Sequence, residues 1–411
     1  MINSDLHKAK ILLIIPYGGV GGIERLALHF YNYYKSRAAL VKTVKIIKLK
    51  SDIINFADDE LFLENRDLMA MSSFDRMLFY LNAPVKLNRI INSNEITHSI
   101  ALGDMANLFS SLTFTSEFKV ASIHALKSVE LSSKTYLNKI FRLAYKSSYI
   151  KFDKIVCISK AIKQDLITNC GFRFVNNMEV IYNPHDIERI RELAEEDISD
   201  PTENEIFKSD VILFLGRLSV QKSPWHLIKA FSRVVLVNKN VKLVFIGDGS
   251  FEVTRFLEKL IKLLNLQERV IFLGRKTNPY KYLSRSKVLA LSSHYEGTPN
   301  VIVESIAVGT PIVTSFCTKG ISELMTVDDK GIKTKTLNKV ESGIISPNFY
   351  TGSLGIPNSG NSEISQNENL MADALIEIIN NLEYKKNLLN NQNTLLAKFD
   401  LGNIAKSYLK Q

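Results

Sequence analysis

Short apolar runs separated by helical stretches occupy most of this chain, and the alternation occurs in two series. The first series contains the runs 11–15, 41–50, 96–102, 118–124 and 153–159, and the second contains 210–218, 241–249, 269–274, 287–293 and 310–315. Strands that alternate with helices form parallel sheets covered by helices on both faces. The sequence therefore predicts an α/β protein with two doubly wound, Rossmann-like domains.

The boundary between the two series lies in the stretch from about 185 to 209, which is charged, contains Pro201 and has no strand-like run. We therefore predict an N-terminal domain over 1–185, a C-terminal domain over 186–395 and a terminal helix over 396–411 that packs back toward the N-terminal domain. Residues 346–368 are rich in Gly, Ser, Asn and Pro, which predicts a long surface loop.

The composition is that of an ordinary globular protein, with 45% hydrophobic and 23% charged residues. Its three cysteines, Cys157, Cys170 and Cys317, have neither disulfide-framework nor zinc-ligand spacing. The apolar run before Pro16 is too short for a signal peptide, and no run approaches the roughly 18–20 residues of a membrane span. These features favour a cytoplasmic protein.

The segment HYEGTPNVIVESIAVGTPIV (294–313) is the richest in candidate site residues. It follows a predicted buried strand and turns through Gly297 and Pro299 into an apolar helix that begins near Asn300. Such a helix start offers unpaired N–H groups to a diphosphate. Glu296 and Glu304 bracket this start, where they can accept hydrogen bonds from a polyhydroxy ligand. An isolated pair of glutamates is more often structural, but the surrounding glycine and prolines favour a ligand site.

Two further segments carry candidate phosphate-binding residues. GRLSVQK (216–222) places Arg217 and Lys222 just after a predicted strand, where two cations suit a diphosphate leaving group, although both can also be solvated surface residues. The glycine-rich turn Gly18–Gly22 does not have the GxGxxG spacing of a dinucleotide loop.

These motifs together resemble the retaining glycosyltransferases of family 4, which have the GT-B fold. Residues 296–304 match the family's ExGxPxxxxE signature, GRLSVQK its GRLxxxK, IGDG (246–249) its glycine-rich turn and GGIE (21–24) its N-terminal GGxE turn. The resemblance extends over nearly the whole chain in the right order. It implies two Rossmann-like domains facing a cleft, with an acceptor-side N-terminal domain and a nucleotide-sugar-binding C-terminal domain.

The resemblance also implies roles for individual residues. Arg217 and Lys222 contact the donor phosphates, Glu304 the ribose, Glu296 the hydroxyls of the donor sugar, and His124 the reacting sugar, although a lone histidine is often structural. The expected catalytic residues are Glu296, His124, Arg217 and Lys222, and the expected substrate-binding residues are Gly21, Gly22, Gly297, Thr298, Pro299, Asn300, Val301 and Glu304. Pro184 replaces the glycine of the family's Asn-Gly pair, which puts a donor contact by that turn in doubt.

The expected chemistry needs neither a metal nor a cofactor, since no Asp-x-Asp follows a predicted strand and the nucleotide sugar is a substrate. The resemblance implies front-face attack with retention at the anomeric carbon, and positioning and leaving-group stabilisation as the enzyme's main contributions. The expected reaction moves a hexose or N-acetylhexosamine from a nucleotide sugar, most simply a UDP-sugar, to a glycan or a polyprenyl-diphosphate-linked sugar in bacterial surface glycan synthesis.

The net charge of +10 comes mainly from one segment, 119–163, which has ten basic and two acidic side chains. Within it, Tyr136, Leu137, Ile140, Phe141 and Ala144 recur at helical spacing among Lys134, Lys139, Arg142 and Lys146. The pattern fits a surface helix packed on a sheet, or a helix lying on an anionic membrane. We expect residues 127–151 to dock the protein at the inner face of the cell membrane. No nucleic-acid motif is present.

Two other functions fit parts of the sequence. A nucleotide-sugar 2-epimerase also has two α/β domains around a cleft, but the register of residues 296–304 and GRLSVQK (216–222) disfavour it. A non-catalytic nucleotide-sugar-binding partner subunit is disfavoured by the presence of Glu296, Glu304, Arg217 and Lys222.

Overall fold

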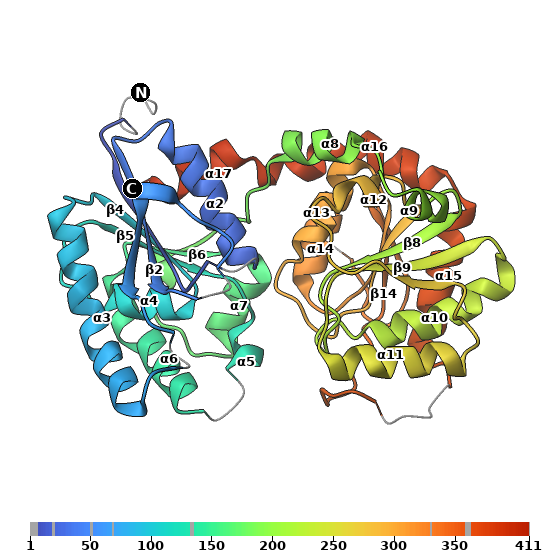
Figure 1. Cartoon of the computed structure of the whole chain (residues 1–411), viewed down its shortest axis with the longest axis horizontal. Coiled ribbons are helices and arrows are strands. Elements are labelled where there is room, and N and C mark those ends of the chain that lie inside the picture. The colour runs from blue at the N-terminus through green and yellow to red at the C-terminus, as the bar shows by residue number, and fades with distance from the viewer. Residues whose placement is uncertain are drawn as a thin grey trace. The chain divides into compact units, whose positions relative to one another are not determined.

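The computed structural model describes residues 7–18, 21–49, 52–67, 70–131, 135–328, 331–357 and 363–410. The chain divides into two compact units (Figure 1). The N-terminal unit runs to His185 and takes up the chain again from Phe399, whereas the C-terminal unit is the continuous segment Asp186–Lys398.

In the described part of the N-terminal unit, seven strands form one parallel sheet in the order β3-β2-β1-β4-β5-β6-β7. The strands are β1 (Lys10–Ile15), β2 (Leu40–Ile47), β3 (Glu60–Glu64), β4 (His98–Leu102), β5 (Phe118–Ile123), β6 (Lys154–Cys157) and β7 (Met178–Val180). The helices are α2 (Gly22–Lys35), α3 (Ser73–Ser93), α4 (Asp104–Ser111), α5 (Lys127–Glu130), α6 (Tyr136–Lys146), α7 (Lys160–Thr168) and α17 (Leu401–Leu409), with short 3₁₀ turns η1 (Ala57–Asp59), η3 (Ser148–Lys151) and η4 (Val175–Asn177).

The apolar run of β1 is continuous because the strand is buried on both faces. Alternate side chains, beginning with Ile11, belong to a core shared with α2 and α17. The intervening side chains, Leu12 and Ile14, belong to a second core shared with α3 and α4. Helix α17 is fixed to the same sheet, since the Ser122 and Tyr408 hydroxyls are hydrogen-bonded at 2.9 Å.

The described part of the C-terminal unit has a second seven-stranded sheet, in the order β10-β9-β8-β11-β12-β14-β13. Its strands are β8 (Asp210–Leu215), β9 (Val241–Ile246), β10 (Val270–Phe272), β11 (Val288–Leu291), β12 (Ile312–Ser315), β13 (Asn338–Val340) and β14 (Gly343–Ser346). Strand β13 is antiparallel to β14 at the edge of an otherwise parallel sheet.

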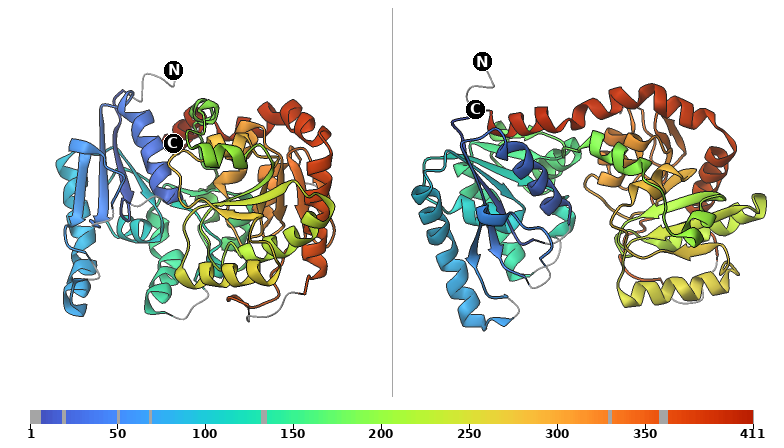
Figure 2. Two further views of the ribbon diagram at one scale, coloured as in Figure 1. Left: turned by 45° about the vertical axis from the view of Figure 1, so that its right-hand side comes forward. Right: turned by 45° about the horizontal axis from the view of Figure 1, so that its top comes forward.

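The C-terminal unit is covered by helices on both faces of this sheet (Figures 1 and 2). They are α8 (Ile187–Glu195), α9 (Pro201–Ile206), α10 (Pro224–Val237), α11 (Phe251–Leu263), α12 (Tyr280–Ser284), α13 (Asn300–Val308), α14 (Lys319–Met325), α15 (Gln366–Asn380) and α16 (Glu383–Leu396), followed by the 3₁₀ turn η5 (Ala397–Phe399). Helices α10, α11 and α15 share one large core with the sheet, in which Trp225 and Phe231 are buried.

The prediction of two doubly wound α/β units is confirmed by these two sheets. The strands β3, β7, β13 and β14 lie outside the ten predicted runs, and the predicted strandless stretch 185–209 contains helices α8 and α9. The described residues between β14 and α15 form no helix or strand, although 358–362 of that predicted loop lie outside the described residues.

Candidate active site

The C-terminal sheet has a switch point between the neighbouring strands β8 and β11. The chain continues from β8 toward one edge through β9 and β10, and from β11 toward the other edge through β12. Such a point leaves a crevice at the carboxyl ends of the two strands, where ligands of open α/β sheets bind. The loops that follow these strands are 216–223 and 292–299. The topology therefore brings together the two motifs predicted to bind the donor.

An ion pair joins the two loops. The Lys222 Nζ lies 2.5 Å from Oε1 of Glu296, which is 7% exposed. The same carboxylate oxygen accepts a hydrogen bond from the Ser293 hydroxyl at 2.7 Å. The pair places a cation and a carboxylate at one point of the crevice, where they can contact the phosphates and hydroxyls of one ligand.

Gln221 is a site residue that the sequence did not indicate. Its side-chain amide donates to the Tyr295 carbonyl at 3.2 Å and reaches Oε2 of Glu296 at 3.4 Å. Its own carbonyl accepts a hydrogen bond from the backbone N–H of His294 at 2.8 Å. Gln221 therefore ties one loop to the other through Glu296 and the two residues that precede it. The motif GRLxxxK gives this position no fixed residue type, so only the three-dimensional contacts identify it.

Backbone strain at Ser223 accompanies this arrangement. Ser223 is buried in the left-handed region with φ 37°, which is uncommon for a residue other than glycine. Its hydroxyl donates to the Ser292 carbonyl at 2.5 Å, and the Ser292 hydroxyl donates to the carbonyls of Lys222 and Ser223 at 3.1 and 3.0 Å. These contacts hold the backbone of Lys222 in place, and the backbone conformation determines the direction in which its side chain leaves the loop.

Helix α13 begins where the sequence predicted, at Asn300, and its N-cap residue, Pro299, makes no side-chain cap. Thr298 carries a buried hydroxyl that has no hydrogen-bond partner among the described residues. The carbonyl of Gly297 lies 2.4 Å from where a Cβ of Gly320 would stand, so only glycine in α14 allows this close approach. Glu304 is buried on the following turn of α13. Residues 297–301 and Glu304 thus surround one helix start.

Arg217 follows the same strand as Lys222 but is exposed. The glycines next to it have a packing role: a Cβ at Gly247 would lie 2.0 Å from the Gly216 carbonyl oxygen, and one at Gly249 would lie 2.7 Å from that of Leu218. The IGDG turn after β9 therefore packs directly on the GRL turn after β8.

The N-terminal sheet has its own switch point between β1 and β4. In the turn after β1, Gly18 donates its N–H to Asp52 at 2.9 Å and accepts hydrogen bonds from the N–H groups of Ile53 and Ile54. Gly19 and Val20 lie outside the described residues, and Gly21 and Gly22 begin α2. The carboxylate of Glu24 accepts the N–H of Gly21, and burial raises its pKa.

The helices that follow the four switch-point strands share a feature. The N-cap residues of α2, α4, α10 and α13 make no side-chain cap, as is also true of α5, α12 and α16 among the described helices, whereas α3, α6, α7 and α15 have one. The first N–H groups of a helix otherwise need a partner. Such starts at the carboxyl ends of the sheets are suited to anionic or polyhydroxy ligands, except that at α2 the Glu24 carboxylate already accepts the Gly21 N–H.

His124 follows β5, as predicted, beside a buried charge cluster. Burial, and then the charge of Lys127, lower the pKa of His124 to about 3, so the imidazole is neutral at physiological pH. Its buried Nε2 has no hydrogen-bond partner among the described residues. Lys127 is itself buried and pairs with Asp104 at 2.9 Å and with Glu130. Tyr145 donates to the other oxygen of Asp104 at 2.7 Å. The sequence did not indicate the roles of Asp104 and Tyr145.

The predicted membrane segment 127–151 divides into inward and outward residues. Lys127 is buried and paired within the charge cluster, and Phe141 and Ala144 belong to a buried core. These three residues therefore cannot face a membrane. Lys139, Arg142 and Lys146 are exposed on α6. Lys134 and the side chain of Leu137 lie outside the described residues.

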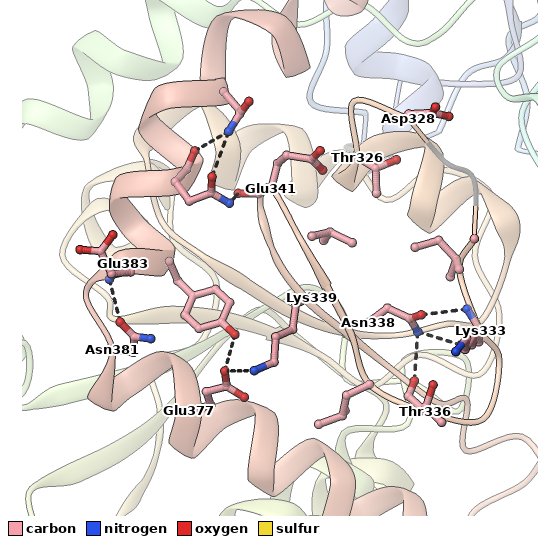
Figure 3. Close-up of a pocket in the computed structure, with 17 residues that line it drawn as sticks. Thr326, Asp328, Lys333, Thr336, Asn338, Lys339, Glu341, Glu377, Asn381 and Glu383 are labelled. Atoms are coloured by element: carbon pink, nitrogen blue, oxygen red, sulfur yellow. Dashed lines mark hydrogen bonds and ion pairs between the residues drawn. The ribbon is translucent and has the colours of Figure 1, made fainter.

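A hollow of about 1000 Å³ lies elsewhere on the C-terminal unit, between β13, α15 and α16 (Figure 3). None of the predicted site residues lines it. Its side chains bind one another: Tyr384 donates to Glu377 at 2.5 Å, and Asn338 donates to the Lys333 carbonyl at 2.7 Å. We therefore locate the candidate site at the switch points and not in this hollow.

Two features are absent from the described residues. They contain no group of three or more His, Cys, Asp and Glu side chains that could hold a metal ion. In the same part of the chain, no helix combines the length and apolar character required to cross a bilayer.

Comparison with known proteins agrees with this fold. Residues 196–341 match the family model described as glycosyl transferases group 1. The Anabaena protein HepE, solved in complex with UDP and glucose, superimposes with a TM-score of 0.72 at 19% identity, over 97% of this chain and 98% of that one.

Two curated relatives share more sequence. An uncharacterised glycosyltransferase of Methanocaldococcus jannaschii is 28% identical over 66% of each chain. An N-acetylgalactosaminyltransferase of Campylobacter jejuni, which acts on a sugar-linked diphospho-undecaprenol, is 35% identical over 46% of this chain and 49% of its own length. The matches thus span between about half and two thirds of these relatives.

The chain therefore has the GT-B fold, and it is similar in sequence to glycosyltransferases.

Proposed function

We propose that the chain is a retaining glycosyltransferase that moves a hexose or N-acetylhexosamine from a UDP-sugar to a sugar carried on a polyprenyl diphosphate, in bacterial surface glycan synthesis. The observation that carries this proposal is the Lys222–Glu296 pair, which joins the two switch-point loops beside the uncapped start of α13. A cation, a carboxylate and a helix N-terminus together match a sugar diphosphate, whose phosphates are anionic and whose sugar presents hydroxyls.

The proposed donor contacts follow from this geometry. The N-terminus of α13, Lys222 and Arg217 stabilise the charge that develops on the departing diphosphate, which is the main demand of the reaction. This arrangement supplies positive charge without a metal ion. Glu296 accepts hydrogen bonds from the donor sugar, and Glu304, one turn farther along α13, accepts them from the ribose. The β-phosphate oxygen that leaves the anomeric carbon takes the proton from the attacking acceptor hydroxyl on the same face.

The N-terminal unit contributes groups suited to neutral sugar. Gly21 and Gly22 present backbone at the start of α2. Because the imidazole of His124 stays neutral, its partnerless Nε2 can exchange a hydrogen bond with a hydroxyl without adding charge near the anomeric carbon.

The Campylobacter relative supports a lipid-linked acceptor, since its name specifies a diphospho-undecaprenol-linked sugar. The UDP and glucose bound to HepE support a UDP-sugar donor.

The exposed cations of α6 support docking at the cytoplasmic face of an anionic membrane. Replacing Lys134, Lys139, Arg142 and Lys146 with glutamate should then abolish flotation with anionic vesicles, and unchanged flotation would contradict docking by this segment.

The proposed function is tested by incubating the protein with UDP-, GDP- and ADP-sugars and measuring nucleoside diphosphate release, with and without a polyprenyl-diphosphate-linked sugar. We expect release from one or more UDP-sugars, stimulated by the acceptor, with the product retaining the donor's anomeric configuration. A 2-epimer formed without transfer, or release with none of the donors, would refute the proposal.

Two variants connect the activity to the site. Glu304→Ala should reduce release strongly because it removes the proposed ribose contact. Glu252→Ala removes an exposed carboxylate from α11 of the same unit and should have no effect. Equal activity of the two variants would contradict the assignment of Glu304.

A further inference from the structure

Helix α3 of the N-terminal unit is apolar on two faces. Phe79, Ala83, Leu87 and Ile91 face inward and belong to the core beneath the sheet. The outward face carries a second row of large apolar side chains, 39–66% exposed, which we call the α3 stripe: Phe74, Met77, Leu78, Leu81 and Val85. A surface helix normally turns polar residues to water, and a contiguous apolar row marks an interaction surface.

The α3 stripe lies on the part of the unit that extends farthest beyond the sheet. The first turns of α3 project past the carboxyl ends of the strands, and α6 projects at the same end (Figures 1 and 2). Helix α4 contacts both α3 and α6, so the two projecting helices flank it. The stripe therefore belongs to the same edge of the N-terminal unit as His124 and the glycine-rich turn.

The charge beside the α3 stripe is mainly positive. Helices α3 and α6 carry six basic side chains and a single acidic one, Asp75. On α6, exposed Lys139, Arg142 and Lys146 accompany two exposed apolar residues, Tyr136 and Leu143. Apolar side chains flanked by cations match the boundary between the headgroups and acyl chains of an anionic bilayer. The same face of a second copy is a poor match, because cations would oppose cations.

We propose that the α3 stripe inserts into the acyl-chain boundary of an anionic bilayer while the cations of α6 contact lipid phosphates. This deepens the proposed function, on which it rests for a lipid-linked acceptor, and assigns the apolar contact to α3. Charge attracts the protein to the surface, and the stripe sets how deeply it is held. The carboxyl edge of the N-terminal sheet then faces the membrane, from which the sugar of a lipid-linked acceptor protrudes.

The test compares the double variant Met77→Ser/Leu81→Ser with the control Leu236→Ser/Leu382→Ser. The control residues are 79% and 73% exposed and lie on the C-terminal unit. Flotation is measured with vesicles of phosphatidylcholine alone and with added phosphatidylglycerol. We expect the wild type and the control to bind the anionic vesicles, and the stripe variant to bind at least about tenfold more weakly. Both variants should unfold at the wild-type temperature.

Three results would overturn the inference. The stripe variant could bind as well as the wild type, both variants could lose binding equally, or the wild type could fail to bind. If light scattering shows a wild-type dimer that the stripe variant converts to a monomer without affecting flotation, the stripe joins two copies instead. Donor hydrolysis in detergent-free solution is measured in parallel. Its persistence in the stripe variant separates a failure of docking from a failure of the proposed glycosyltransferase activity.

Discussion

The two switch points use their charges differently. In the C-terminal unit, Lys222 crosses from the loop after β8 to Glu296 after β11, so the pair spans the crevice itself. In the N-terminal unit, Asp104 after β4 is paired instead with Lys127, which comes from beyond β5, and the turn after β1 contributes backbone. One unit therefore presents an ion pair that spans its crevice, whereas the other presents glycine backbone, the buried Glu24 carboxyl group and, after the neighbouring strand β5, a neutral histidine. This difference suits a diphosphate on one unit and a neutral sugar on the other.

The largest expected effect is at the charged crevice. Lys222→Gln removes the proposed phosphate contact and leaves Glu296 buried without its cation. We expect nucleotide-sugar turnover to fall about 10²- to 10³-fold, the range seen when one transition-state donor is removed. Lys239→Gln, at an exposed lysine of the same unit, should be silent. A steady-state rate within twofold of wild type for Lys222→Gln would refute the role of this pair.

A smaller loss is expected at the neutral crevice. His124→Ala removes the proposed uncharged hydrogen bond to the sugar, so we expect kcat/KM to fall about tenfold, with nucleotide binding unchanged because the proposed contact does not involve the nucleotide. His124→Gln retains a hydrogen-bonding group and should recover part of the rate. Calorimetric titration with UDP checks the binding. Weaker UDP binding by His124→Ala would contradict the assignment of the diphosphate to one unit and the neutral sugar to the other.

Gln221→Leu tests positioning separately from contact. It removes the hydrogen bonds to the Tyr295 carbonyl and the Glu296 carboxylate, so we expect a several-fold drop in kcat from a less fixed Glu296. Gln221→Glu, which places a second carboxylate beside Glu296, should be worse. The exposed Gln267→Leu is the matched control. If Gln221→Leu and Gln267→Leu have the same kcat, Gln221 does not position the carboxylate.

The smallest expected effect is a decrease in the free energy of unfolding at acidic pH, caused by buried histidines in both units. Burial lowers the pKa of His124 and His185 in the N-terminal unit to about 3, and that of His294 in the C-terminal unit to about 4. The unfolded chain takes up these protons near pH 6.5 and the folded chain does not, so the stability is complete above pH 6.5 and falls as the pH decreases toward 3–4. Each histidine accounts for at most about 1.4 kcal/mol at pH 5.5.

Urea unfolding at pH 7.5 and 5.5 measures this loss. The double variant His124→Gln/His185→Gln should lose less stability on acidification than the wild type. Because both histidines belong to the N-terminal unit, the substitutions should change the pH dependence of the stability of that unit. An unchanged pH dependence would mean that these histidines are protonated in the folded protein.

The parts of the fold visible in the sequence are those in which apolar side chains form continuous runs. The central strands, such as β1 and β8, are buried on both faces and were predicted. Of the missed strands, β3 and β13 lie at sheet edges, where polar side chains interrupt the apolar run, as in Glu60–Glu64, whereas β14 is a buried interior strand of only four residues. Helices α8 and α9 were missed because their charged outer faces resemble a linker.

The site was predictable where chemistry is encoded in a short motif. Glu296 and Lys222 come from such motifs, and topology brings them together. Gln221, Asp104 and Tyr145 come from tertiary contacts between loops, which no local pattern specifies. The same holds for Lys127: in the sequence it is one more cation of a basic segment, whereas its burial among carboxylates depends on the fold.

The re-entry of the chain into the N-terminal unit has a consequence for its biosynthesis. Residue Tyr408 is fully buried against β5, and the His185 N–H is bound to the Phe399 carbonyl at 3.0 Å. A ribosome synthesises β1 to β7 first, yet the helix that completes their core emerges only after the whole C-terminal unit. The C-terminal unit, by contrast, is one uninterrupted stretch. The half of the protein made second can therefore finish folding before the half made first.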